Sequence, residues 1–109
     1  GILDLISFLK ITSSPLSSGA EVYRLLKSHG VAEKNIAVIT HAAHKKARHI
    51  YDGQDDYVLD TLRKFEEFDI TQKEEIKELI EQIDNIITFS STATISQLVY
   101  KIMMSYSDI

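Results

Sequence analysis

The chain has 109 residues, 44% of them hydrophobic and 26% charged, with no cysteine and a net charge of −4 at pH 7. This composition is typical of one globular domain, and it excludes a disulfide framework and a thiolate metal site. The lack of cysteine suits a cytoplasmic protein, which is the expectation here. No apolar run approaches the roughly 20 residues that span a bilayer, so we expect no membrane partner. Because the sequence begins inside a helical pattern without a methionine, we expect residues 1–109 to be a single domain excised from a longer chain.

Two helices are predicted, one on each side of Pro15. The first covers Ile2–Ile11, where apolar residues recur at helical spacing. Pro15 ends it, because proline lacks a backbone donor and restricts the residue before it. Ser18 and Glu21 predict a capping box at the start of the second helix, Gly19–Ser28. The residues expected to be buried are Ile2, Leu5, Ile6 and Leu9 in the first helix and Val22, Leu25 and Leu26 in the second.

The third helix is predicted from Asn35 to His49, with Asn35 as its N-cap. Within it, Ile36–Thr40 is rich in β-branched residues and is the one segment whose composition would also suit a strand. A polar loop at 52–56 leads into a short fourth helix. The residues expected to be buried are Ile36, Ile39, Ala43, Ala47 and Ile50 in the third helix and Val58, Leu59, Leu62 and Phe65 in the fourth.

Capping boxes also predict the starts of the last two helices. Thr71 and Glu74 begin the fifth helix, which ends at the polar residues 90–92, and Thr94 and Gln97 begin the sixth. The predicted fold class is therefore all-α, a single compact domain of about six helices. The residues expected to be buried are Ile76, Leu79, Ile80, Ile83, Ile86 and Ile87 in the fifth helix and Ile95, Leu98, Val99, Ile102 and Met103 in the sixth.

Positive charge is concentrated between residues 24 and 49. This segment contains six lysine or arginine residues and one acid, Glu33, so its net charge is +5 while the rest of the chain carries −9. The four histidines of the chain lie in the same segment. Such an asymmetry indicates an anionic partner for one face of the domain.

Most of these basic residues belong to the predicted third helix. Residues three or four apart share a face of a helix, so Lys45 and Arg48 lie together, with two histidines one turn earlier. Lys34 lies near the N-terminal end, where the helix dipole favours phosphate. If the anionic partner is a nucleic acid, this face would follow its backbone without reading bases, because phosphate contacts carry no sequence information. The candidate phosphate contacts at and along this helix are Lys34, just before its start, and His41, His44, Lys45, Lys46 and Arg48 within it.

No catalytic or metal site is predicted. The chain lacks the glycine-rich loop with lysine that cradles nucleotide phosphates. His41 and His44 could chelate a metal from one turn of helix, but no third ligand is evident and the neighbouring cations would repel it. The acidic pairs Asp55-Asp56 and Glu66-Glu67 come with no nucleophile, and we interpret them as solvated carboxylates. We therefore expect no cofactor in this domain.

The turn Gly30-Val31-Ala32 admits two interpretations. Gly30 could end the preceding helix at the C′ position, where a left-handed backbone favours glycine. Alternatively, the turn could offer its backbone N–H groups to a phosphate at the start of the next helix. Ala32 and Glu33 weaken the second interpretation, because alanine adopts a left-handed backbone less readily and a carboxylate repels phosphate.

The order of residues from Asp4 to Leu26 resembles the 2B subdomain that is inserted in UvrD/Rep-type superfamily-one DNA helicases. In that family, a helix similar to Asp4–Ile11 is followed by an Asn/Ser-Pro turn, here Ser14-Pro15, and then by a helix similar to Tyr23–Leu26. The turn 30–32 stands where the family often has Gly-Ile-Gly, and residues 95–106 look like the closing helix of the subdomain. The resemblance thus covers nearly the whole chain and is most specific between residues 5 and 26.

The resemblance implies an accessory subdomain without catalysis of its own, in a parent helicase that moves on single-stranded DNA with ATP and Mg²⁺ and acts in DNA repair. The subdomain would contact duplex DNA or regulate unwinding by swivelling, with DNA and the motor domains as its partners. In the family, the Gly-Ile-Gly turn contacts duplex phosphates, which adds Gly30 and Val31 to the candidate contacts. AddA/RecB-like helicase–nucleases carry a comparable insertion without that turn. The alternative is a free-standing protein-interaction module whose basic helix docks on an acidic protein.

Overall fold

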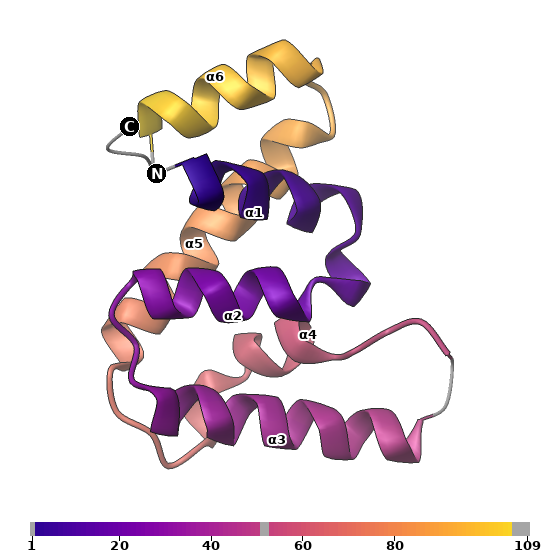
Figure 1. The fold of residues 1–109 in the computed structure, drawn as a ribbon, viewed down its shortest axis with the longest axis vertical. Coiled ribbons are helices and arrows are strands. Elements are labelled where there is room, and N and C mark those ends of the chain that lie inside the picture. The colour runs from indigo at the N-terminus through magenta and orange to yellow at the C-terminus, as the bar shows by residue number, and fades with distance from the viewer. Residues whose placement is uncertain (1, 51–52, 106–109) are drawn as a thin grey trace.

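The computed structural model describes residues 2–50 and 53–105, and within them every regular element is helical (Figure 1). The all-α class predicted from the sequence is confirmed, and the β-branched run 36–40 is part of a helix. The described residues form six α-helices and two short 3₁₀ helices. In chain order the elements are α1 (Ile2–Ser13), η1 (Pro15–Ser17), α2 (Gly19–Ser28), α3 (Glu33–His49), α4 (Val58–Arg63), η2 (Phe65–Glu67), α5 (Lys73–Ser90) and α6 (Ile95–Ser105).

The helices α1, α2 and α3 follow one another across the molecule, and α5 crosses behind α1 and one end of α2 (Figure 1). Helix α1 packs against α2, α5 and α6, whereas α3 packs mainly against α4 and touches α2. As a result α3 lies at one edge of the domain and α6 at the opposite edge (Figure 1). A helix at an edge keeps one long side in solvent, which decides where a binding surface can form.

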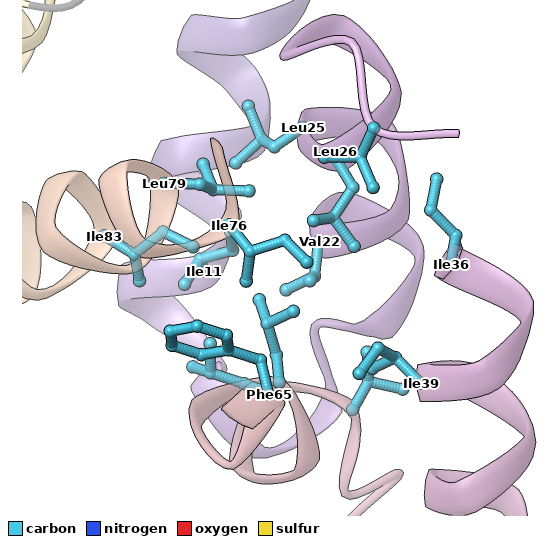
Figure 2. Close-up of a cluster of buried hydrophobic side chains, with 14 of the residues drawn as sticks. Ile11, Val22, Leu25, Leu26, Ile36, Ile39, Phe65, Ile76, Leu79 and Ile83 are labelled. Carbon is cyan, nitrogen blue, oxygen red and sulfur yellow. The ribbon is translucent and has the colours of Figure 1, made fainter. Parts of the chain in front are cut away.

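One hydrophobic core joins the helices (Figure 2). The stripe predicted for α2 is buried completely, and Figure 2 shows it between side chains of α5 and α3. The residues predicted to be buried in the fourth helix are buried as well, although Phe65 belongs to η2 and not to α4. On α5 only Ile80 and Ile87 are partly exposed, at the edge of the stripe. Helical periodicity therefore identified the core of these helices correctly. The largest fully buried side chains are Phe8, Ile11, Leu25, Leu26, Ile36, Ile39, Leu62, Ile76, Leu79, Ile83, Ile86 and Ile102.

The predicted buried faces of α1 and α6 and the end of the α3 stripe are partly wrong. Helix α1 buries Phe8 and Ile11, whereas Ile2 and Ile6 are exposed. Apolar residues occur nearly all around α1, so packing against α2 and α5, and not periodicity, selects the buried side. Helix α6 is covered on one side only, by α1 and α5, and buries Leu98 and Ile102. The residues expected inside but found exposed are Ile2, Ile6, Ile50, Ile95 and Met103, and those that are only half-buried are Leu5, Leu9, Ala47 and Val99.

The capping box predicted for Ser18 and Glu21 does not form. The Ser18 hydroxyl instead donates to the carbonyl of Pro15 (2.9 Å) and closes the 3₁₀ turn before α2. The N–H of Gly19 donates to Asp56 Oδ2 (2.8 Å), and the N–H of Val58 donates to Asp56 Oδ1 (3.1 Å). One carboxylate thus satisfies the N-termini of both α2 and α4, which assigns Asp56 a structural role.

The predicted caps of α3 and α5 are also wrong, because the residues concerned bond to each other across the domain. Helix α3 begins at Glu33, and Asn35 lies buried in its first turn. The Asn35 amide donates to the carbonyl and the hydroxyl of Thr71 (3.2 and 2.9 Å), so neither residue caps its own helix. Only the third capping box is confirmed: at the start of α6, Thr94 and Gln97 exchange side chain–backbone bonds of 3.0 and 3.2 Å.

Gln72 joins the turn between α2 and α3 to the start of α5. Its Oε1 accepts bonds from the N–H of Ala32 (2.6 Å) and from the Asn35 amide (3.0 Å), and its Nε2 donates to the carbonyl of Gly30 (2.7 Å). Gln72 also has a left-handed backbone, with φ of +60°, which disfavours a side chain with a Cβ atom. These bonds hold the first turn of α3 against the start of α5.

We expect Gln72→Ala to lower the free energy of unfolding by about 1–3 kcal/mol, because it leaves the Ala32 N–H and the Asn35 amide without this acceptor. Gln72→Gly loses the same bonds, but glycine adopts the left-handed backbone without strain. Its free energy of unfolding should therefore fall less than that of Gln72→Ala. Urea unfolding followed by circular dichroism measures both variants. Losses below about 0.5 kcal/mol for both, as at an ordinary surface position, would contradict the structural role of Gln72.

Candidate nucleic-acid interface

The outward face of α3 collects most of the basic residues that the sequence singled out. The core side of the helix carries Ile36, Ile39 and Ala43, which are buried. Positions on the opposite side of the 3.6-residue turn are exposed to solvent. The exposed basic residues of this face, called here the α3 basic face, are Lys34, His41, His44, Lys45, Arg48 and His49.

The C-terminal half of the α3 basic face borders a shallow groove of about 400 Å³. Among the described residues, no carboxylate lines it, and neither Lys45 nor Arg48 forms an ion pair. Their charges are therefore directed at solvent and are available to an anionic partner. The residues that line the groove are His41, His44, Lys45, Arg48 and His49.

Lys46 was a candidate contact, but the structure turns it toward α4, away from the α3 basic face. Its Nζ lies 2.7 Å from Asp60 Oδ2 and 5.1 Å from the ring centroid of Tyr57. Hydrogen bonding between the two groups raises the pKa of Lys46 and lowers the pKa of Asp60. A lowered carboxyl pKa means that this pair contributes to stability at neutral pH and that its contribution is lost as acid protonates Asp60. Lys46 therefore fixes α3 to α4.

The turn at Gly30 forms a helix C-cap, the first of the two interpretations. Gly30 has φ of +81°, its N–H donates to the carbonyl of Lys27, and the N–H of Val31 donates to the carbonyl of Leu26, both at 3.0 Å. This is the Schellman pattern, and both Val31 and Leu26 are buried in the hydrophobic core. The N–H of Ala32 is bonded to Gln72. The N–H groups of Gly30 and Val31, which were candidate phosphate contacts, are thus used inside the protein.

Glu33 at the start of α3 is neutralised by neighbours on α2. Its carboxylate lies 3.1 Å from Lys27 Nζ and accepts a bond of 3.2 Å from the Tyr23 hydroxyl. These partners lower the pKa of Glu33, chiefly through the hydrogen bond with Lys27. The repulsion that Glu33 was expected to exert on a phosphate is therefore offset locally. Sequence reasoning missed this group because its members come from two helices joined by a turn.

The structure also shows the surroundings of two other candidate groups, the histidine pair His41 and His44 and the acidic pair Asp55-Asp56. Within residues 2–50 and 53–105, no group of three or more histidine, aspartate or glutamate side chains is placed to hold a metal ion. Asp55, one of the acidic pair near α4, accepts a bond of 2.6 Å from the N–H of Tyr57, and its neighbour Asp56 caps two helices. Both carboxylates thus support the loop that leads into α4.

A second groove, of about 610 Å³, lies between the end of α5 and α6. It is largely apolar, and Phe89, Tyr100 and Met104 are among the side chains that line it. Lys101 Nζ lies 4.9 Å from the centroid of the Phe89 ring. Tyr100 and Met104 are about two-thirds exposed. This groove is on α6 and the α3 basic face is on α3, so the two surfaces occupy opposite edges of the domain (Figure 1).

None of the described helices combines the length and the hydropathy that crossing a bilayer requires. Comparisons with protein-family models, with curated protein sequences and with solved structures find no significant match to this chain. The functional assignment therefore depends on the residues and their geometry.

Proposed function

We propose that this chain is an accessory subdomain of an ATP-dependent DNA helicase, similar to the 2B subdomain of the UvrD/Rep type, and that its α3 basic face contacts the backbone of duplex DNA. The single observation that carries the proposal is the α3 basic face itself. It combines three permanent cations with three imidazoles, and within the described residues no carboxylate lines its groove.

The helical arrangement supports the family resemblance. A helix, a turn that contains Pro15, and a second helix follow one another as they do in that family, and Leu25 and Leu26 of the second helix are buried. A long helix, α5, and a final helix, α6, complete the domain. These features agree with the expected architecture, and they leave the basic helix α3 at an edge where a duplex has access (Figure 1).

The proposed contact is electrostatic. From Lys34 to Arg48 the face extends about 21 Å along the helix at 1.5 Å per residue, which spans several phosphates of one groove edge. Lysine, arginine and protonated histidine bind phosphate oxygens through charge-assisted hydrogen bonds. Contacts of this kind hold the domain on a duplex without selecting a sequence.

ATP and Mg²⁺ would bind the motor domains of the parent protein, since this chain has no phosphate loop. Such a protein would act on cellular DNA in the cytoplasm, in repair. The subdomain would then contribute by holding duplex DNA while the motor advances on one strand.

Binding of the purified domain to a 20-base-pair duplex, measured by fluorescence anisotropy at several salt concentrations, tests the proposal. With Lys34, Lys45 and Arg48 as contacts, we expect weak binding at pH 8 with a slope of log K against log salt of about −2.7. Two unrelated duplex sequences should bind equally. No binding at low salt, or tighter binding of polyglutamate than of DNA, would contradict the proposal and favour docking on an acidic protein.

A further inference from the structure

We propose that the α3 basic face binds the phosphate backbone in a pH-dependent way, more tightly at pH 6 than at pH 8, through His41, His44 and His49. This inference rests on the proposed function and assigns a regulation to the same site. Imidazole is the side chain whose charge ordinarily changes between pH 5 and 8. Three imidazoles and three permanent cations share this face, so the face can reach twice the charge that it carries when the imidazoles are neutral.

The spacing along α3 places each histidine one helical turn from a permanent cation. His41 precedes Lys45 by four residues, His44 precedes Arg48 by four, and His49 follows Lys45 by four. A phosphate bound between these side chains favours the charged form of an imidazole. Phosphate binding should therefore favour protonation of the imidazoles, and protonation should favour phosphate binding. The affinity for DNA should thus be higher at lower pH.

No other described charge neutralises these imidazoles. On the α4 side, Asp60 is engaged with Lys46 and lies near Lys64, and Asp55 is bonded to the N–H of Tyr57. On the α2 side, Glu33 is engaged with Lys27 and Tyr23. None of these side chains lines the groove beside the histidines.

The fourth histidine shows what a structural role looks like in the same domain. His29 is only partly exposed, and both of its ring nitrogens have partners, the carbonyl of Leu25 at 2.9 Å and Gln82 Oε1 at 3.0 Å. In contrast, His41, His44 and His49 are exposed and have no hydrogen-bond partner among the described residues. Their replacement should leave the fold intact, which makes them suitable for a binding test.

The test measures affinity for the 20-base-pair duplex at pH 8 and pH 6 in 50 mM salt. The wild-type domain should bind at least about fivefold more tightly at pH 6, with a salt slope steeper by up to about 0.9 for each imidazole in contact. The variant with all three exposed histidines changed to glutamine should have the same affinity at pH 6 as at pH 8, because it keeps the three permanent cations but has no imidazole left on this face. The variant Lys45→Gln, Arg48→Gln should bind more weakly at both pH values and keep the pH dependence.

The possible failures are distinguishable. Equal wild-type affinity at both pH values, or the same gain at pH 6 in the triple histidine variant, would overturn the pH dependence while leaving DNA binding in place. Absence of binding at both pH values would overturn the proposed function and this inference together. Circular dichroism and the unfolding midpoint of each variant at both pH values serve as folding controls.

Discussion

Charge reversal of Lys45 and Arg48 together is expected to weaken duplex binding on the order of a hundredfold in 50 mM salt. The two substitutions remove two phosphate contacts and put carboxylates in their place, and each lost contact flattens the salt slope by about 0.9. Both side chains are exposed, so the free energy of unfolding should change by less than about 0.5 kcal/mol. Anisotropy titrations with the variant Lys45→Glu, Arg48→Glu measure the effect.

The matched control is Lys73→Glu, Lys77→Glu, which changes the net charge equally but lies on α5. This control should lose far less affinity, because its lysines are outside the α3 basic face. Lys46 is left unchanged in both variants, since its ion pair with Asp60 would confound binding with stability. An equal loss in the two double variants would mean that only the total charge of the domain matters, and would contradict a defined binding face.

Ile83→Ala should lower the free energy of unfolding by about 2–5 kcal/mol. Ile83 is in the middle of α5, is 1% exposed, and Figure 2 shows its side chain beside Ile11 and Leu79 in the core. Removing buried methyl groups there loses their burial and leaves a cavity. For a domain of this size, such a loss is a large fraction of the total stability, which is typically 5–15 kcal/mol.

Ile95→Ala is the matched control for this prediction, because it removes the same atoms from a residue that is 74% exposed. It should change stability by less than about 0.5 kcal/mol, as expected at a surface position. Urea unfolding followed by circular dichroism compares the two variants. Equal effects at the two positions, or a small effect at position 83, would show that the core assignment of α5 is wrong.

The sequence predicted the helices well, because their signal is the local spacing of apolar residues. The core faces of α2, α4 and α5 and the capping box of Thr94 and Gln97 depend on residues within one or two turns. The errors arose where distant partners compete. Asp56 replaces Ser18 at the start of α2, and Asn35 bonds Thr71 across 36 residues, which no local pattern can reveal.

In the candidate site too, the features that depend on local spacing were predictable and those that depend on distant contacts were not. Most of the α3 basic face was predictable because its residues belong to one helix, where spacing determines which residues share a side. His49 also lies on this face, but it was not among the predicted contacts. The role of Lys46 was not, because only the packing of α3 on α4 brings Asp60 to it. The C-cap at Gly30 was one of two interpretations from sequence, and choosing between them required the hydrogen bonds of the folded turn.

The most direct test of the proposed DNA contact is chemical-shift mapping of the isotope-labelled domain with a 12-base-pair duplex at low salt. The method detects weak binding and reports its location residue by residue. We expect the largest amide shifts on the α3 basic face, at Lys34, His41, His44, Lys45, Arg48 and His49. Absence of shifts at saturating duplex, or the largest shifts in the α6 groove around Tyr100 and Met104, would contradict the proposed interface.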